Sequence, residues 1–177
     1  MNPFKKYHCI KQHDVTDCGA ACIAIISKQH GLKIPITQIR EVAGTDKKGT
    51  NAFGLIKAAK ELGFSAKGVK GEPEYLTRDL PLPCIAHFIK GNLLHYVVIH
   101  EIKDNQIVVA DPGEGIVKYN PEDFYEIWSG VLILMVPGEK FEKRDETTGF
   151  FSRFMGLILP QKRLLVEICI ASILYTP

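Results

Sequence analysis

The sequence predicts an α+β fold in which helices come first along the chain and an antiparallel sheet follows. Helical patterns dominate up to about residue 64, whereas residues 64–136 contain short runs of β-branched and aromatic residues separated by turn residues. Two of these runs are joined by the polar segment 103–105, which suits a hairpin. Helices followed by strands is the order typical of the α+β class.

Three helices are expected in the first part of the chain. The first covers residues 20–27 and follows Thr16 and Asp17, whose side chains are of the types that cap helix N-termini. A short second helix is expected near residues 37–42. The third covers residues 51–62, where small and aliphatic residues recur at helical spacing and Gly63 provides a stop.

Strands are expected in the second part at residues 64–69, 84–89, 93–100, 105–111, 115–119 and 130–136. Residues 119–124 carry the pattern of a short capped helix with proline in its first turn.

Cys18 lies in the segment QHDVTDCGAAC, residues 12–22, at or just inside the N-terminus of the first expected helix. The free backbone N–H groups and the helix dipole favour negative charge there, so a thiol loses its proton more easily. A thiolate is a nucleophile, and Gly19 would leave backbone uncovered where a substrate carbonyl could approach the sulfur. The competing interpretation is a buried structural cysteine, the commoner use of a lone cysteine.

A histidine and an aspartate downstream favour the catalytic interpretation. His95 stands near the start of the expected strand 93–100, and Asp111 ends the expected strand 105–111. Pairing of these strands in a hairpin would bring Asp111 close to His95, where its carboxylate could fix the imidazole tautomer and stabilise the protonated ring. The sequence thus predicts a Cys-His-Asp arrangement. Gln12, six residues before Cys18, could donate to the oxyanion formed when the thiolate attacks a carbonyl.

These motifs resemble those of the bacteriocin-processing cysteine peptidases, the papain-like peptidase family C39 domains at the N-terminus of peptidase-containing ABC transporters. The resemblance covers about residues 6–137 and rests on the segment 12–22, the HYVV run at 95–98 and the ADP turn at 110–112. It implies a papain-like fold with N-terminal helices packed on an antiparallel sheet. It also implies that Cys18, His95 and Asp111 form the catalytic triad and that Gln12 assists the oxyanion.

The resemblance further implies removal of a leader peptide by cleavage after a double-glycine-type motif, coupled to export of the released peptide. The implied partners are the leader, the membrane and nucleotide-binding domains of the same transporter, and a second copy in a homodimer. ATP and Mg²⁺ would bind a nucleotide-binding domain beyond Pro177, and no cofactor is expected in these residues. The implied location is the bacterial cell membrane, with the peptidase on the cytoplasmic side. Two alternatives remain open: a docking domain that binds a leader without cutting it, and a Cys-His-Asp amidase acting on another bond.

Composition excludes some other functions. The chain of 177 residues has 22 basic and 20 acidic residues, a net charge of +2, so no large basic field indicates nucleic acid binding. Five cysteines with no secretory signal before them fit reduced thiols in the cytosol. A zinc site is disfavoured because the C-x3-C pair Cys18 and Cys22 has no second ligand pair at suitable spacing. We expect Cys22 to pack in the core.

The C-terminal part predicts a membrane context. Residues 1–137 are interpreted as the peptidase domain and the charged stretch 138–148 as a linker. Residues 149–177 are dense in apolar residues and are interpreted as a juxtamembrane helix and the start of a first transmembrane helix, preceded by basic residues. The alternative is an amphipathic helix that packs on its own domain, which the carboxylate of Glu167 favours.

His100 and His87 are the rivals of His95. His100 is expected on the opposite face of the same strand, because five positions separate the two residues, and His87 lies on the preceding strand.

Overall fold

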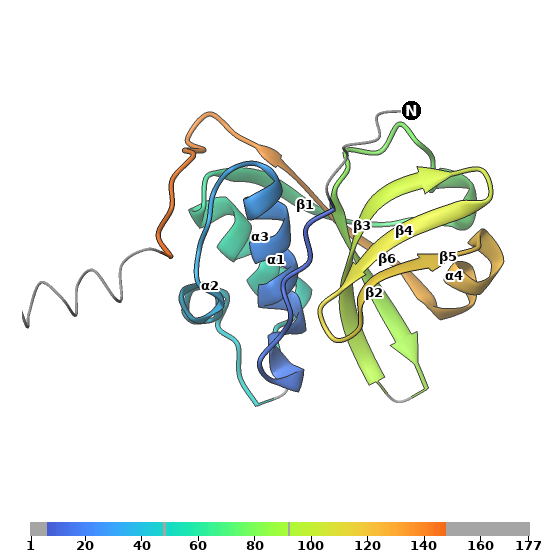
Figure 1. Cartoon of the computed structure of the whole chain (residues 1–177), viewed down its shortest axis with the longest axis horizontal. Coiled ribbons are helices and arrows are strands. Elements are labelled where there is room, and N and C mark those ends of the chain that lie inside the picture. Colours follow the sequence, from blue (N-terminus) through green and yellow to red (C-terminus); the bar gives the residue numbers. More distant parts are fainter. Residues whose placement is uncertain (1–6, 48, 92, 148–177) are drawn as a thin grey trace, which may run out of the picture. The chain divides into compact units, whose positions relative to one another are not determined.

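Helices come first in the described chain and a six-stranded sheet follows, as Figure 1 shows. The structure is a computed structural model that describes residues 7–47, 49–91 and 93–147. The chain divides into the units Met1–Asp145 and Glu146–Pro177. The expected juxtamembrane and transmembrane segment, residues 149–177, lies outside the described residues, so everything below concerns the first unit.

Helix α1, Cys18–Gln29, is the centre of the helical layer and follows a 3₁₀ turn, η1, at Val15–Asp17. Every residue of α1 from Cys18 to Ser27 is buried, which is why this stretch combines small residues with isoleucines instead of showing one polar face. Helix α2, Ile36–Ala43, and helix α3, Ala52–Glu61, pack beside it, and α1 and α3 also contact the sheet. All three expected helices are confirmed within two residues at each end.

The start of the α1 region differs from the expectation. Asp14, not Thr16 or Asp17, provides the side-chain cap: it occupies the N-cap of η1 and accepts a hydrogen bond from the Thr16 N–H at 3.1 Å. Asp17 makes no capping bond to α1. The expectation was wrong because the helical path begins one turn earlier, in η1. Asn51 caps α3 by accepting from the Gly54 N–H at 2.8 Å.

The sheet has the strand order β1-β6-β2-β3-β4-β5, and all neighbouring strands pair antiparallel. The strands are β1, Phe64–Lys70; β2, Cys84–Lys90; β3, Leu93–Lys103; β4, Gln106–Asp111; β5, Gly115–Tyr119; and β6, Trp128–Pro137. Each expected strand is present, and β3 and β6 extend further than expected. Helix α4, Pro121–Ile127, lies between β5 and β6 with Asn120 as its cap. The short 3₁₀ turn η2, Pro73–Tyr75, was not expected.

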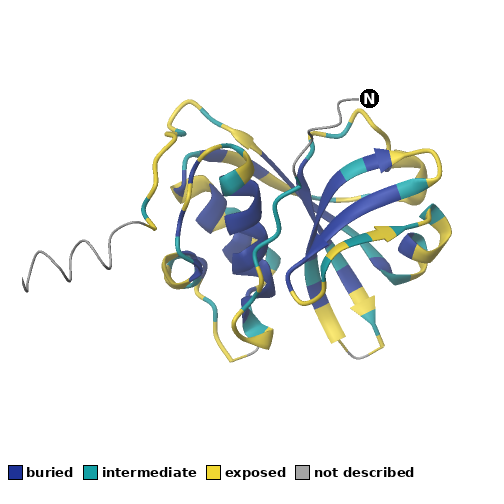
Figure 2. Ribbon diagram, in the orientation of Figure 1, coloured by how far each residue is buried: buried dark blue, intermediate teal, exposed yellow. Residues whose placement is uncertain are grey.

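Both faces of the sheet are covered over part of their area, as the buried strand positions in Figure 2 indicate. Val98 and Ala110 belong to the core shared with α1, whereas Phe88 belongs to a second core. In that core Phe88 packs edge-on against Phe124 of α4 with ring centroids 5.2 Å apart. Alternation of side chains along each strand places neighbours in different cores. The predicted α+β fold class, helices packed on an antiparallel sheet, is confirmed.

Part of the stretch expected to be a linker contacts the helical layer. The Phe141 ring lies 4.5 Å from the Phe64 ring, measured between centroids. The Lys33 N–H donates to the Arg144 carbonyl at 2.9 Å, and the Lys33 ammonium lies 2.6 Å from the Asp145 carboxylate. Residues 141–145 are therefore held against the rest of the first unit. The boundary between residues 137 and 138 stays a prediction.

Within residues 7–47, 49–91 and 93–147, no helix has the length and apolar character needed to cross a membrane.

Candidate active site

Cys18 is the first residue of α1 and is buried, with only 6 % of its surface exposed. Gly19 allows α3 to pack closely at this point, because a Cβ atom there would lie 2.9 Å from Leu55 Cδ2. Gly19 is itself buried. The expectation that it leaves backbone uncovered for substrate was therefore wrong: this glycine serves helix packing. Cys22 lies one turn further on and is fully buried in the core, as expected.

His95 and Asp111 are brought together by the register of β3 and β4. Val98 stands opposite Ala110, so Asp111 comes opposite Val97, two positions from His95. Residues two apart on a strand share a face, so both side chains point the same way. The His95 Nε2 lies 2.8 Å from the Asp111 Oδ1. The predicted proximity of these two residues is present in the structure.

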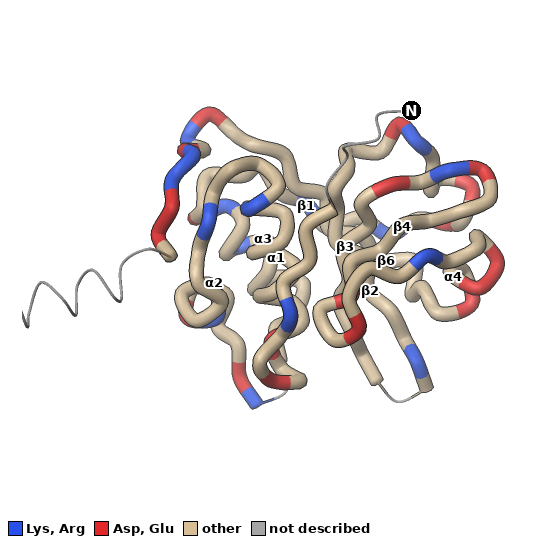
Figure 3. The backbone as a smooth tube through the Cα atoms, viewed as in Figure 1, with Lys and Arg blue, Asp and Glu red and all other residues tan. Residues whose placement is uncertain are grey.

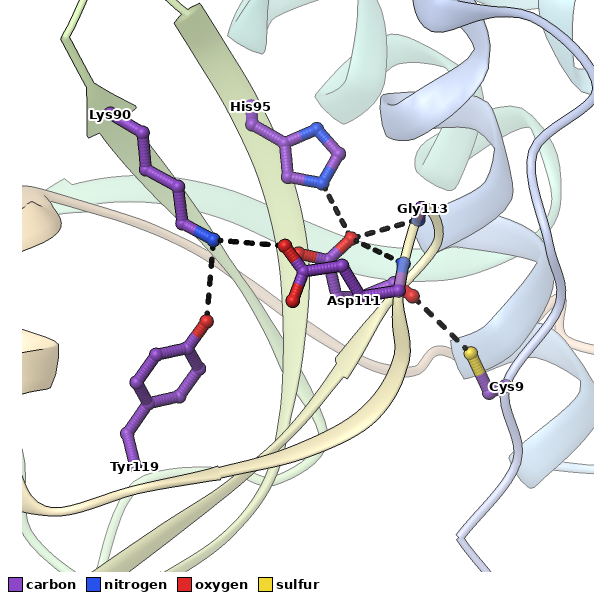
Figure 4. A network of polar contacts seen from close by, with 7 residues as sticks. Cys9, Lys90, His95, Asp111, Gly113 and Tyr119 are labelled. Carbon is purple, nitrogen blue, oxygen red and sulfur yellow. Dashed lines mark hydrogen bonds and ion pairs between the residues drawn. The ribbon is translucent and has the colours of Figure 1, made fainter.

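The Asp111 carboxylate is held from two sides, as Figure 4 shows. Besides His95, its Oδ1 accepts the Gly113 N–H at 2.8 Å and the Glu114 N–H at 3.4 Å. Asp111 is 2 % exposed. The turn that follows β4 therefore fixes the carboxylate before any substrate arrives, and its orientation forces His95 to carry a proton on Nε2.

The Cys18 side chain also interacts with the His95 ring. Burial alone would lower the pKa of His95, but the hydrogen bonds and charges of Asp111 and Cys18 outweigh it and raise that pKa to about 9. Burial would raise the pKa of Asp111, but His95 and the two backbone N–H groups lower it. The arrangement thus favours a protonated imidazole between a carboxylate and a sulfur, the state in which a cysteine nucleophile is active.

Gln12 is tied to the same turn through its backbone, whose N–H donates to the Pro112 carbonyl at 3.0 Å. Its side-chain Oε1 is buried and has no hydrogen-bond partner in the part of the chain that the structure describes. A buried amide oxygen without a partner is costly, so this side chain is oriented at a cost in stability. Its role at the oxyanion stays a prediction.

The two rival histidines have other partners. His100 is the extra residue of a β-bulge between Ile99 and Glu101, and its Nε2 lies 2.8 Å from the His8 carbonyl. His87 contacts the Ser129 hydroxyl through Nδ1 at 2.8 Å, and its ring centroid lies 5.0 Å from that of Tyr96. Burial, and next to it the charge of His95, lower the pKa of His87. The histidine bonded to the Asp111 carboxylate is His95.

Two residues next to the site were not predicted from the sequence. The Cys9 thiol donates to the Asp111 backbone carbonyl at 3.6 Å, a contact between residues 102 positions apart. Tyr96 is half-buried next to the site: burial, together with the charges of Cys18 and Cys22, raises its pKa to about 12. No local sequence pattern predicts the contact between Cys9 and Asp111. The Tyr96 position could have been found, because it directly follows the base in the sequence.

The described residues carry neither a large patch of one charge nor a cluster of metal-binding side chains. Basic and acidic side chains are interspersed along the backbone in Figure 3, without a field of one sign. Among residues 7–47, 49–91 and 93–147, no three His, Cys, Asp or Glu side chains are placed to hold a metal ion.

The chain is similar in sequence to known proteins. The model of the Peptidase C39 family matches residues 6–140. The chain is 39 % identical over 161 residues to the lactococcin-G-processing and transport ATP-binding protein LagD of Lactococcus lactis subsp. lactis, covering 90 % of this chain and 23 % of that protein. It is 34 % identical over 177 residues to the transport/processing ATP-binding protein ComA of Streptococcus pneumoniae, covering 98 % of this chain and 25 % of that protein. The chain spans about a quarter of the length of these curated relatives.

Solved structures show the same similarity. The peptidase domain of Streptococcus ComA, a bifunctional ABC transporter of a quorum-sensing pathway, superposes with a TM-score of 0.71 at 35 % identity, covering 75 % of this chain and 99 % of that one. A double-glycine motif protease from an AMS/PCAT transporter, solved with its leader peptide, superposes with a TM-score of 0.69 at 33 % identity, covering 75 % and 92 %. The family expected from the sequence is therefore confirmed: the chain belongs to the Peptidase C39 family.

Proposed function

We propose that this chain is a cysteine endopeptidase that removes a leader by cleaving after a double-glycine-type motif. The observation that carries the proposal is a buried group of three side chains: Cys18 at the start of α1 interacts with His95, and His95 bonds Asp111. Family membership supports the reaction class. The similar protease solved with a leader peptide supports the substrate class.

In the first half of the reaction, the Cys18 sulfur attacks the carbonyl carbon of the second small residue of the motif. Negative charge develops on the carbonyl oxygen, and we assign its stabilisation to the Gln12 side-chain amide and the Cys18 backbone N–H. As the C–N bond breaks, the protonated His95 gives its proton to the leaving amine. The released product is the mature peptide, and the leader remains on Cys18 as a thioester.

In the second half, His95 is neutral and takes a proton from water. The resulting hydroxide attacks the thioester carbonyl, and the Cys18 thiolate leaves as the carboxylate of the leader forms. Asp111 stays ionised throughout and holds the imidazole in the tautomer that faces the sulfur. No metal or cofactor enters these steps.

Specificity for two small residues follows from steric exclusion. The reactive sulfur is almost wholly buried, so the backbone of the substrate must approach it closely. A side chain larger than hydrogen or methyl before the scissile bond would separate the carbonyl from the sulfur. We assign most of the binding affinity to the rest of the leader.

The relatives' names support a larger context. They are processing and transport ATP-binding proteins, so we propose that this chain is part of a longer exporter in a bacterial cell membrane, with the peptidase on the cytoplasmic side. ATP and Mg²⁺ would bind its nucleotide-binding domain, outside these residues, and the exporter would be a homodimer. In this proposal residues 1–137 form the peptidase domain, residues 138–148 a linker, and residues 149–177 the approach to the membrane.

The test is cleavage of a synthetic precursor peptide with a Gly-Gly motif, followed by mass spectrometry. Cleavage at the single bond after the motif is expected for the wild-type chain, and Cys18→Ala should bind the peptide without cutting it. A Gly-Val motif should bind with similar affinity but lose kcat/KM. Binding without cleavage by the wild type would favour the docking alternative, and release of ammonia or another acyl product would favour the amidase alternative.

A further inference from the structure

Asp17, the residue directly before the nucleophile, is a buried carboxylate. Only 1 % of its surface is exposed. One carboxylate oxygen, Oδ1, is ion-paired and hydrogen-bonded with the Arg40 guanidinium, which reaches it from α2. The other, Oδ2, accepts the Asp14 N–H at 3.1 Å. Asp17 therefore makes no capping bond to α1, although it stands at the N-cap position.

A buried carboxylate at this place opposes the chemistry of Cys18. A thiolate and a carboxylate on consecutive residues repel each other, and burial weakens the screening by water. The helix dipole and the free N–H groups that favour a thiolate at the start of α1 would be offset by this neighbouring negative charge. The pairing with Arg40 removes the conflict, because the guanidinium cancels the charge of Asp17.

The other groups facing Cys18 do not supply this compensation. His95 on β3 interacts with Cys18 and bonds Asp111 at the end of β4. The charge of Cys18 acts on Tyr96, also on β3, and Cys22 lies one turn along α1. The imidazolium of His95 is already matched by the Asp111 carboxylate, so thiolate formation leaves this group of side chains with one negative charge. An unpaired Asp17 would add a second, and Arg40 is the cation bonded to it.

We propose that Arg40 is a positioning residue for the Cys18 reaction: it neutralises Asp17 and pins the turn that leads into α1, so that the thiolate forms at the helix start. This inference rests on the proposed role of Cys18 as the nucleophile. This pair could not be predicted from the sequence, because Arg40 lies 23 positions from Asp17, on another helix.

The test uses the 177-residue chain and measures the rate of Cys18 alkylation by iodoacetamide between pH 4 and 10. Cys18 and Cys22 share the tryptic peptide 12–28, so fragment-ion mass spectrometry assigns the modified sulfur. Arg40→Met should move the midpoint of the alkylation curve upward by about one pH unit, since it leaves an unpaired buried carboxylate on the residue directly before Cys18. Arg40→Lys keeps the charge and should remain near the wild-type midpoint.

The double variant Asp17→Asn/Arg40→Met distinguishes an effect of charge on the alkylation midpoint from an effect of losing a structural contact. Because both charges are gone, its midpoint should return toward the wild-type value, whereas loss of a structural contact would not be repaired by a second deletion. Lys33→Met is the matched control: it removes a cation from an exposed pair with Asp145 and should move nothing.

Equal upward shifts for the single and double variants, or no shift in Arg40→Met, would overturn the inference. If Arg40→Met does not fold, as judged by thermal unfolding, Asp17→Asn decides: it retains Arg40 and should lower or leave the midpoint, so a rise contradicts the proposal. Alkylation needs no substrate. A chain that shows these shifts but cuts no Gly-Gly peptide refutes the proposed substrate alone, and a chain that cuts the peptide without the shifts refutes the role of Arg40 alone.

Discussion

Asp111→Asn tests the interaction between Asp111 and His95, because it removes the charge of the side chain and hardly changes its shape. In the structure Oδ1 accepts from His95, and it also accepts from the Gly113 and Glu114 N–H groups. An asparagine must therefore place its carbonyl oxygen at that position, because its NH₂ group there would face two backbone donors. The carbonyl still accepts the His95 Nε2–H, so the tautomer is kept and only the negative charge is lost.

The size of the effect follows from that bond. A hydrogen bond to a charged group stabilises by roughly 1.5–3 kcal/mol, and burial of both partners places this one in the upper part of the range. Since about 1.4 kcal/mol corresponds to a factor of ten, we expect kcat/KM to fall roughly 10- to 100-fold. This is smaller than the loss of about 10⁴ for the same change in a Ser-His-Asp triad, because the cysteine ion pair exists before substrate binds.

The pH profile provides the second readout. Cleavage needs His95 protonated, and its pKa is raised to about 9, so activity should fall as the pH rises through about 9. Asp111 is one cause of that elevation. In Asp111→Asn the imidazole should lose its proton at lower pH, and the alkaline limb should move down by about one to two pH units.

The assay is kcat/KM for a Gly-Gly precursor peptide from pH 5 to 10, with thermal unfolding as a check on folding. Glu114→Gln is the matched control, since it removes a neighbouring carboxylate that is 60 % exposed and paired with Lys90. That variant should stay within about twofold of wild type. Wild-type activity and an unmoved alkaline limb in folded Asp111→Asn would refute the role of the carboxylate.

Two further predictions concern the rival base and the end of the domain. His95→Ala should lose more activity than Asp111→Asn, whereas His100→Ala should retain most of it because its Nε2 bonds the His8 carbonyl; an inactive His100→Ala beside an active His95→Ala would reverse the assignment. A truncation after Gly138 should be less stable than one after residue 145 by about 1 kcal/mol in urea unfolding, since it deletes the half-buried Phe141 ring. Equal stability would show that residues 139–145 contribute nothing.

Local patterns were sufficient to predict the α-helices and the strands, but not the two 3₁₀ turns. The strands of the sheet were predictable because their β-branched runs end at glycine, proline or polar turns, and the hairpin of β3 and β4 then fixed which residues could meet. The proximity of His95 and Asp111 could be predicted in this way, because a hairpin places the end of its second strand beside the start of its first.

Contacts between distant segments were not predictable in the same way. The cap of the first helix was misplaced by one turn, because Thr16 and Asp17 are as suitable by type as Asp14. Gly19 was given an exposed role because nothing in the sequence reveals that Leu55 packs against it. Residues 141–145 carry many charges, and the pattern gave no sign that Phe141 would reach Phe64.

The segment 8–12 links the elements that carry the candidate site residues. Within a few residues it bonds β3 through the His8 carbonyl and His100, and it bonds the end of β4 through the Cys9 thiol and the Asp111 carbonyl. The Gln12 N–H then donates to the Pro112 carbonyl, immediately before the chain enters η1 and α1. The segment thus holds the chain just before η1 and α1 against the turn that follows β4. A loss of these bonds should loosen the spacing between Cys18 and His95 without unfolding the chain, because the fully buried residues of both cores lie outside this segment and only Cys9 and Ile10 of it pack against one of them.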